Sequence, residues 1–283
     1  MKFSAVPMIY FKPMVLDRTM KLEEWFPIAA SLGIDGTEIH DRSLVSFEPS
    51  YLDFIHREIS KNNLVVSQFI GAADFTHPDP AVRARELEIT KRNIDAAARL
   101  GANSVRLTAG QVHPNVSRKQ GVDWACEGLK ASADYALGRK VWIAYEDHYK
   151  DYFWERPDFS QRGEIFLEIV ERLQDTSLKV NFDFGNPVMI GEDSIALLGP
   201  VVDRVVNVHC SDRFQGEYPH QIAGQGSVNF PAGFRILRKA GYDGWLASEY
   251  NGNQGLEGLR RSLDYVRTTW NQIAREYINP FSQ

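Results

Sequence analysis

Four side chains that can bind a metal ion or move a proton stand at the ends of short apolar runs in the second half of the chain. In chain order they are Glu146, Asp183, His209 and Glu249. Asp183 is flanked by Phe182 and Phe184, and His209 also stands between two apolar residues. Because strand side chains alternate between two faces, each polar group must face away from its apolar neighbours.

Three carboxylates and one imidazole held close together would repel one another unless a cation neutralised them. Carboxylate oxygens with one nitrogen suit Mn²⁺ or Mg²⁺, and Co²⁺ or Zn²⁺ can also accept this set. A competing interpretation makes each residue a buried polar group satisfied by hydrogen bonds. That interpretation explains a single residue well, but it explains four on successive strand ends poorly. The four residues therefore predict a divalent-cation site.

The elements that must position these residues form a repeating pattern of apolar runs and amphipathic stretches. Each run is bounded by turn residues and is rich in Val, Ile or aromatics, as buried parallel strands are. In residues 256–273, apolar residues recur every three or four positions, which predicts a helix with one buried stripe. The expected strands are residues 3–9, 36–39, 64–70, 104–108, 141–146, 179–184, 205–210 and 245–250.

A glycine near the end of several helical stretches supports the same organisation. Gly33, Gly101 and Gly241 each precede a strand by a few residues, and Gly138 is a looser copy. Repeated helix–glycine–strand units predict a parallel sheet with helices between its strands. Eight such units without a Pro- or Gly-rich linker favour an α/β fold, a single (β/α)8 TIM barrel over residues 1–283.

Composition narrows the classes of function. The formal net charge of −5 argues against nucleic acid or an anionic membrane as a partner. Two cysteines, Cys126 and Cys210, are too few for a disulfide framework. No uncharged apolar run approaches the ~20 residues that span a bilayer. We expect a cytoplasmic protein without a nucleic-acid or membrane partner.

The chain resembles the sugar isomerase/epimerase group with a xylose-isomerase-like TIM barrel, which includes tagatose and psicose 3-epimerases, hydroxypyruvate isomerase and inosose dehydratase. The resemblance covers essentially the whole chain, and residues 208–212, 224–230 and 241–250 are its most specific parts. It implies that the four residues above bind Mn²⁺, Mg²⁺ or Co²⁺. It also implies that Glu146 and Glu249 exchange a proton next to the carbonyl of a keto sugar, through a metal-stabilised enediolate.

A narrower resemblance favours an alternative reaction. Residues 146–151, followed by Trp154 and Pro157, are similar to metal-dependent lyases of the C-glycoside deglycosidase type, which β-eliminate 3-keto glycosides. In that branch His148 would be the base. The epimerases commonly carry a histidine three residues after the metal-binding Asp, where this chain has Asn186. Asn186 is therefore a candidate for contact with the substrate.

Other polar residues near the strand ends are candidates for binding the sugar or supporting the site. A guanidinium can bind sugar oxygens or a carboxylate, although an ordinary ion pair is the competing interpretation. Asp212 is expected to orient His209, and His220 is expected at the surface. The expected substrate-binding residues are Arg213, Arg106, Glu38, Gln68 and Asn186.

Two further classes of protein are weighed against the enzyme. A repair endonuclease on a related barrel would need more histidines and a basic face, and seven histidines with a charge of −5 count against it. A metal-binding subunit without catalysis is disfavoured by the intact ligand set. The expected partner is a sugar or keto-glycoside substrate. The resemblance implies a homodimer or homotetramer, with a hetero-oligomer containing a small subunit as the alternative.

Overall fold

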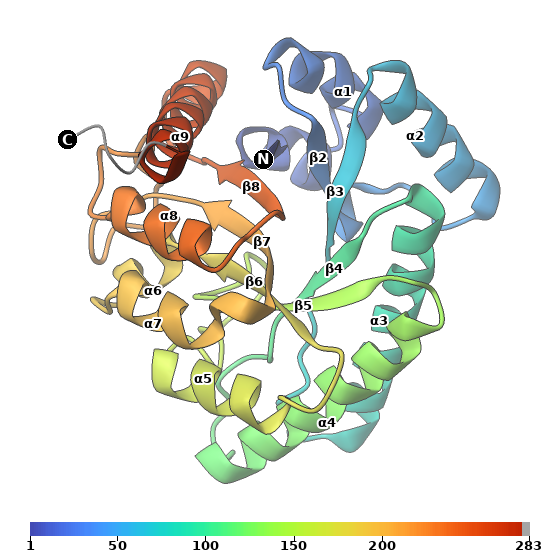
Figure 1. The fold of residues 1–283 in the computed structure, drawn as a ribbon. Coiled ribbons are helices and arrows are strands. Elements are labelled where there is room, and N and C mark those ends of the chain that lie inside the picture. The colour runs from blue at the N-terminus through green and yellow to red at the C-terminus, as the bar shows by residue number, and fades with distance from the viewer. Residues whose placement is uncertain (279–283) are drawn as a thin grey trace.

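The computed structural model describes residues 1–278, and these residues form a closed barrel of parallel strands. Each strand pairs with the next, and the first pairs with the last (Figure 1). The predicted (β/α)8 TIM barrel is confirmed. The strands are β1 (Lys2–Val6), β2 (Gly36–His40), β3 (Val65–Ile70), β4 (Ser104–Leu107), β5 (Trp142–Glu146), β6 (Lys179–Asp183), β7 (Val205–Cys210) and β8 (Trp245–Glu249).

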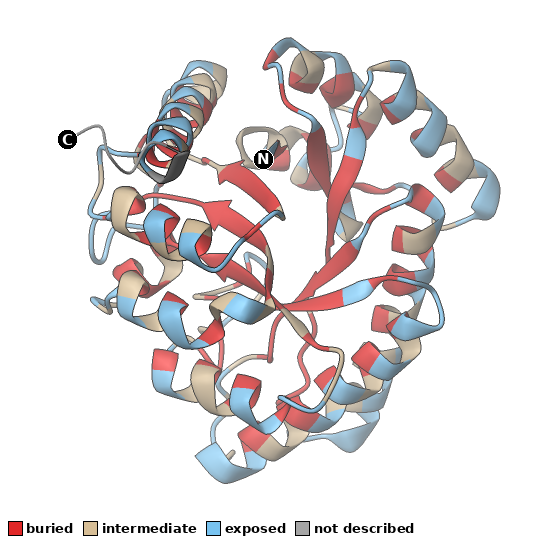
Figure 2. Ribbon diagram, viewed as in Figure 1, coloured by how far each residue is buried: buried red, intermediate tan, exposed pale blue. Residues whose placement is uncertain are grey.

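Helices surround the barrel and cover its apolar outer face, so the strands are buried while the outward helix faces are exposed (Figure 2). The predicted stripe of the last helix is buried at Leu259, Leu263, Val266, Trp270 and Ile273. The α-helices are α1 (Leu22–Ser31), α2 (Pro49–Lys61), α3 (Pro80–Leu100), α4 (Arg118–Leu137), α5 (Gly163–Arg172), α6 (Gly185–Met189), α7 (Ser194–Val201), α8 (Phe230–Lys239) and α9 (Gly255–Ile278). Short helical turns are η1 (Met8–Tyr10), η2 (Lys12–Leu16), η3 (Asp41–Ser43) and η4 (Val202–Arg204).

One local prediction was wrong. The first strand was expected over residues 3–9 but ends at Val6, because Pro7 has no N–H for the ladder and η1 begins directly after it. Gly138, the looser copy among the helix-ending glycines, has φ −64°. Lys140 adopts the left-handed conformation there instead, with φ 58°.

A layer of polar side chains fills the barrel lumen below the strand ends. Asn207 Nδ2 lies 2.6 Å from Asn181 Oδ1, 2.9 Å from Glu38 Oε1 and 3.2 Å from Gln68 Oε1. All four residues are buried, and they come from β2, β3, β6 and β7. Their hydrogen bonds join opposite sides of the barrel and form a floor under the residues at the strand ends.

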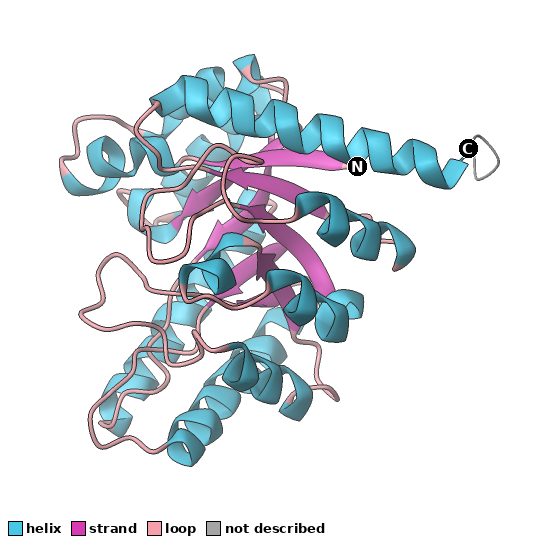
Figure 3. Ribbon diagram, turned by 90° about the vertical axis from the view of Figure 1, so that its left-hand side faces the viewer, coloured by secondary structure: helices cyan, strands magenta, loops and turns pink. Residues whose placement is uncertain are grey.

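The connections at the carboxyl ends of the strands are the long ones. In the side view they gather at the end of the barrel opposite the N-terminus (Figure 3). Within residues 1–278, no helix combines the length and apolar character needed to cross a membrane.

The close approach of two of these loops gives the first testable prediction. Gly110 has φ 134°, and a Cβ there would lie 2.7 Å from Asp74 Oδ1 and 2.8 Å from the Thr76 nitrogen. We expect Gly110→Ala to lower the free energy of unfolding by about 2 kcal/mol or more, measured by urea denaturation. Gly138→Ala is the control, because its Cβ would make only an ordinary contact. Equal stability of the two variants would contradict the prediction.

Candidate active site

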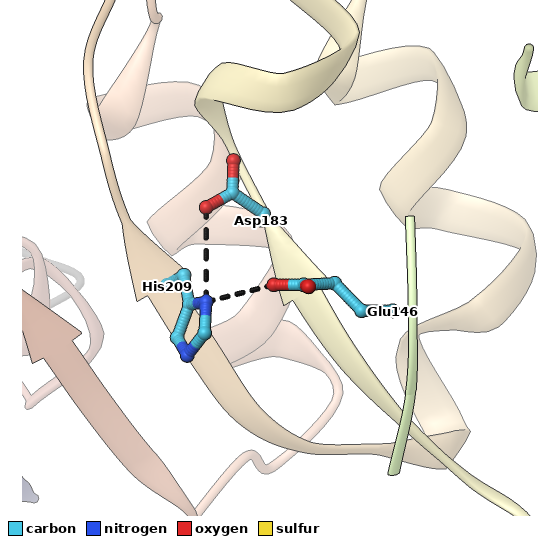
Figure 4. A group of neighbouring side chains, drawn as sticks. All are labelled: Glu146, Asp183 and His209. Atoms are coloured by element: carbon cyan, nitrogen blue, oxygen red, sulfur yellow. Dashed lines mark ion pairs between the residues drawn. The ribbon is translucent and has the colours of Figure 1, made fainter. Parts of the chain in front are cut away.

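The four predicted ligands meet at the carboxyl ends of their strands. His209 Nδ1 lies 2.8 Å from Glu146 Oε1, 3.1 Å from Glu249 Oε2 and 3.8 Å from Asp183 Oδ2. Figure 4 shows Glu146 and Asp183 pointing toward this ring nitrogen. Donor atoms of Glu146, Asp183 and His209 all lie within 4.8 Å of one another. The arrangement follows from strand register, because Asp183 pairs with His209 and each of these residues faces the lumen.

Glu38 fixes the orientation of the imidazole. The carboxylate oxygens of Glu38 lie 3.1 and 3.2 Å from His209 Nε2, on the side of the ring away from the three other carboxylates. When Nε2–H donates to Glu38, Nδ1 is left facing the ligand site. Glu38 was expected to bind substrate, but it is fully buried and does not line the hollow described below.

The buried charged groups of the site strongly shift one another's pKa values. Burial, together with Glu249 and Glu146, raises the pKa of Asp183 to about 7. Burial also acts to raise the pKa of Glu146, but Arg106 and His209 outweigh it and bring that pKa to about 2. The pKa of His209 is raised well above its usual value because, although burial lowers it, Glu38 and Glu146 raise it more. Three carboxylates and one nitrogen around a single point fit a hard divalent cation.

A hollow opens above these residues. Of the predicted substrate-binding residues, Arg106, Arg213 and Asn186 line it. Arg106 is buried, with its Nε 2.5 Å from Glu146 Oε2. Arg213 is also buried and donates through Nη1 to the Tyr218 carbonyl. The remainder of the lining is both polar and apolar, which suits a sugar with hydroxyl groups and C–H faces.

Gln68 does not reach the hollow. It lies lower in the barrel, where its amide donates to Ser104 Oγ at 3.1 Å and accepts from Asn207. Gln68 was expected to contact substrate, but it stands in the middle of β3, one layer below the strand ends.

Asp212 has a different role from the expected one. Its two carboxylate oxygens accept from the backbone N–H groups of Arg213, Gly224, Gly226 and Val228, at 2.8 to 3.0 Å. The partner of His209 is Glu38 instead. Asp212 holds the loop after β7 closed, because its carboxylate occupies a concave nest of N–H groups. His220, in the same loop, is buried rather than at the surface.

A second acid–base pair lies beside the carboxylates. His148 lines the hollow, and its Nδ1 is 3.5 Å from Asp158 Oδ2. Asp158 is fully buried, and its other oxygen accepts from the Ser160 N–H and hydroxyl, both at 2.7 Å. The Trp154 ring stands edge-on to the imidazole, with centroids 6.1 Å apart. Asp158 thus lies at ion-pair distance from one nitrogen of His148.

Three supporting residues were not predicted. Asn181 and Asn207 each stand two positions before a ligand, so strand alternation alone would have placed them on the lumen face. Asn181 Nδ2 donates to Glu146 Oε1 at 2.7 Å. Asp158 had no comparable signal, because it reaches His148 through the fold of a long loop.

Comparisons with known proteins agree with this geometry. Residues 26–269 match the family described as xylose isomerase-like TIM barrel. L-ribulose-5-phosphate 3-epimerase UlaE of Salmonella typhi is 28% identical over 166 residues, which are 59% of this chain and 56% of that protein. The chain therefore spans about half the length of the curated relatives that it matches.

Solved structures share the fold along the chain. L-ribulose 3-epimerase superimposes with a TM-score of 0.82 at 14% identity, covering 100% of this chain and 98% of the other. The 3-keto-D-glucoside 4-epimerase YcjR from E. coli superimposes with a TM-score of 0.76 at 18% identity, covering 95% and 99%. At such identities the likeness shows the fold alone.

The position of Asp212 gives a prediction about the loop after β7. Asp212→Ala leaves four backbone N–H groups without their acceptor, so we expect chymotrypsin to cleave at the exposed Phe214 or Tyr218 about tenfold faster. Cleavage rates are followed by mass spectrometry, with the exposed Asp243→Ala as control. Unchanged cleavage would mean that Asp212 does not hold this loop.

Proposed function

The chain belongs to the xylose isomerase-like TIM barrel family, and on that premise we propose that it is a divalent-cation-dependent epimerase or isomerase of a keto sugar. One observation carries the proposal: three carboxylates converge on one ring nitrogen at the base of a hollow lined by polar and apolar side chains. The relative named L-ribulose-5-phosphate 3-epimerase supports the assignment.

The proposed ligands are Glu146, Asp183, His209 and Glu249. Mn²⁺ or Mg²⁺ in this site would supply Lewis acidity that makes a proton next to the sugar carbonyl removable near neutral pH. Glu146 and Glu249 line the hollow, and both have lowered pKa values despite burial. Both are therefore ionised, and they are the carboxylates available to take the proton and to return it.

Positively charged and amide groups would hold the rest of the sugar. Arg213 and Asn186 line the hollow and can donate to hydroxyl or carbonyl oxygens. The floor residues Glu38 and Asn207 do not contact the sugar in this proposal, and instead keep His209 in place.

The proposed substrate carries no phosphate at the loop after β7. Barrel enzymes often bind phosphate through the loops that follow the seventh and eighth strands. Here the N–H groups of Gly224, Gly226 and Val228 already bind the carboxylate of Asp212. A phosphate group would meet a like charge in that nest, which favours a free ketose over a sugar phosphate.

Chelation and exchange with solvent deuterium test the proposal. Protein loaded with Mn²⁺ is incubated in D₂O with D-fructose, D-tagatose or L-ribulose, and NMR follows deuterium at the carbon next to the carbonyl. We expect exchange that EDTA abolishes and Mn²⁺ restores. Glu249→Gln should slow exchange by 10²-fold or more, about the contribution of a positioned acid–base group, and Glu146→Gln should slow it through the loss of a charged metal ligand.

The control for these variants is Glu164→Gln, which changes an exposed glutamate far from the site. Its exchange rate should equal that of the unaltered protein. Absence of exchange in every ketose, with metal bound, would count against the epimerase.

A second candidate is a lyase acting on a 3-keto glycoside, and the His148–Asp158 pair favours it. In this reaction His148 would take the proton next to the carbonyl. The electron pair of that C–H bond would form a carbon–carbon double bond, and the aglycone would leave the neighbouring carbon with the electrons of its own bond. The orientation of the imidazole by a buried carboxylate suits this use as a base.

Variants of the pair separate the two candidates. For a lyase, His148→Gln and Asp158→Asn should slow release of p-nitrophenol from a 3-keto p-nitrophenyl glucoside by about 10²-fold or more. The absorbance of the released phenolate gives the rate, and His56→Gln, on the outer face of α2, is the control. A glycoside that stays intact with the unaltered protein would rule out the lyase.

Assembly, boundaries and location stay predictions. We infer that residues 1–283 form one domain, of which the last five residues lie outside the described part. A homodimer or homotetramer is the proposed assembly, with a hetero-oligomer as the alternative. The proposed location is the cytoplasm.

A further inference from the structure

Arg106 is a buried guanidinium with few partners. It lies on β4, and within residues 1–278 its side-chain contacts are the Glu146 carboxylate, with Nε 2.5 Å from Oε2, and the Gly71 carbonyl, which accepts from Nη1 at 3.1 Å. A charge taken out of water is expensive and needs compensation. The contact with Glu146 supplies it, and the same contact restrains the carboxylate.

Both oxygens of Glu146 are engaged by the protein. Oε1 accepts from Asn181 and faces His209 Nδ1, while Oε2 faces Arg106. The side chain is only 1% exposed. With Oε1 directed to the ligand site, Oε2 is the oxygen that would have to take a proton from carbon. The Arg106 guanidinium lies against that oxygen as an ion pair.

Glu249 is held much less. Its carboxylate contacts His209 Nδ1 at 3.1 Å, and its side chain is 17% exposed at the hollow. Among the charged contacts of the described residues, none holds the Glu249 carboxylate as Arg106 holds Glu146. Glu249 therefore has an oxygen free to face the sugar, and the two glutamates are not equivalent.

We propose that Arg106 is a positioning residue that commits Glu146 to the metal ion and leaves removal of the substrate's proton to Glu249. This inference rests on the proposed function, and it replaces the expectation that the two glutamates exchange the proton symmetrically. Arg106, expected to bind substrate, acts on the reaction through Glu146.

Binding of Mn²⁺ without substrate tests whether Arg106 positions Glu146. A pure charge effect of Arg106 and a positioning effect would change the Mn²⁺ affinity in opposite directions. Removing a cation beside the site would tighten Mn²⁺ binding if Arg106 acted only by its charge. Loss of the restraint on Glu146 should instead weaken binding. We expect Arg106→Met to raise the Kd for Mn²⁺, measured by calorimetry, by about 10- to 100-fold. Arg106→Lys should recover part of this loss.

Arg99→Met is the matched control, because Arg99 pairs with Asp53 at the surface and should leave the Mn²⁺ affinity unchanged. Unaltered or tighter binding by a folded Arg106→Met variant would overturn the positioning role. If that variant does not fold, Arg106→Lys decides: a Kd equal to that of the unaltered protein overturns the role, and an intermediate Kd supports it.

The assignment of proton removal to Glu249 is tested at Mn²⁺ concentrations that saturate each variant. With Arg106 in place, a Gln at position 146 keeps an amide oxygen for the metal but cannot act as base. We expect Glu146→Gln to slow deuterium exchange by about tenfold, and Glu249→Gln to slow it by 10²- to 10⁴-fold. Equal losses would show that Glu146 moves the proton and would overturn the proposal.

The two failures are distinguishable. If the unaltered, metal-loaded protein exchanges no ketose proton, the proposed function fails and the role of Glu249 falls with it. The Mn²⁺ affinities then still decide whether Arg106 positions Glu146, because they need no substrate.

Discussion

The burial of three carboxylates around one imidazole is the constraint on which the rest of the structure depends. Like charges at such distances raise each other's free energy, and burial removes the water that would screen them. The raised pKa of Asp183, about 7, shows this cost directly. Only a rigid support can hold such groups together, and a closed barrel supplies one, because every strand is paired on both sides and no strand end can move independently.

The support continues below the strand ends as a polar floor. Asn207 joins Glu38 to Asn181, and these two residues contact opposite partners, the His209 ring and the Glu146 carboxylate. An apolar lumen would pack equally well, but it would leave Nε2 of the imidazole without a partner and the ring free to turn. The floor therefore sets which nitrogen faces the ligand site, at the expense of burying four polar side chains.

Strand alternation predicted correctly which side chains face the lumen. It did not tell how far below the mouth of the barrel each side chain lies. Glu146, Asp183 and Glu249 end their strands, so facing the lumen also placed them at the mouth. Glu38 and Gln68 face the lumen from the middle of β2 and β3, and they lie in the floor instead of in the hollow. The predicted contact of Asp212 with His209 failed for another reason. Asp212 lies beyond the end of β7, where side chains no longer alternate as in a strand and the path of the loop decides their contacts.

The hollow brings polar and apolar side chains together at one end of the barrel. Carboxylates, imidazole and Arg213 come from β5 to β8 and their loops, and His40 and Arg106 come from β2 and β4. Apolar side chains lie directly beside them, because Val6 on β1 pairs with Glu249 on β8. The proposed sugar substrate has polar edges and apolar C–H faces, so it would satisfy both kinds of side chain only in a restricted set of orientations. The barrel that crowds the charges would thus also limit how the substrate meets them.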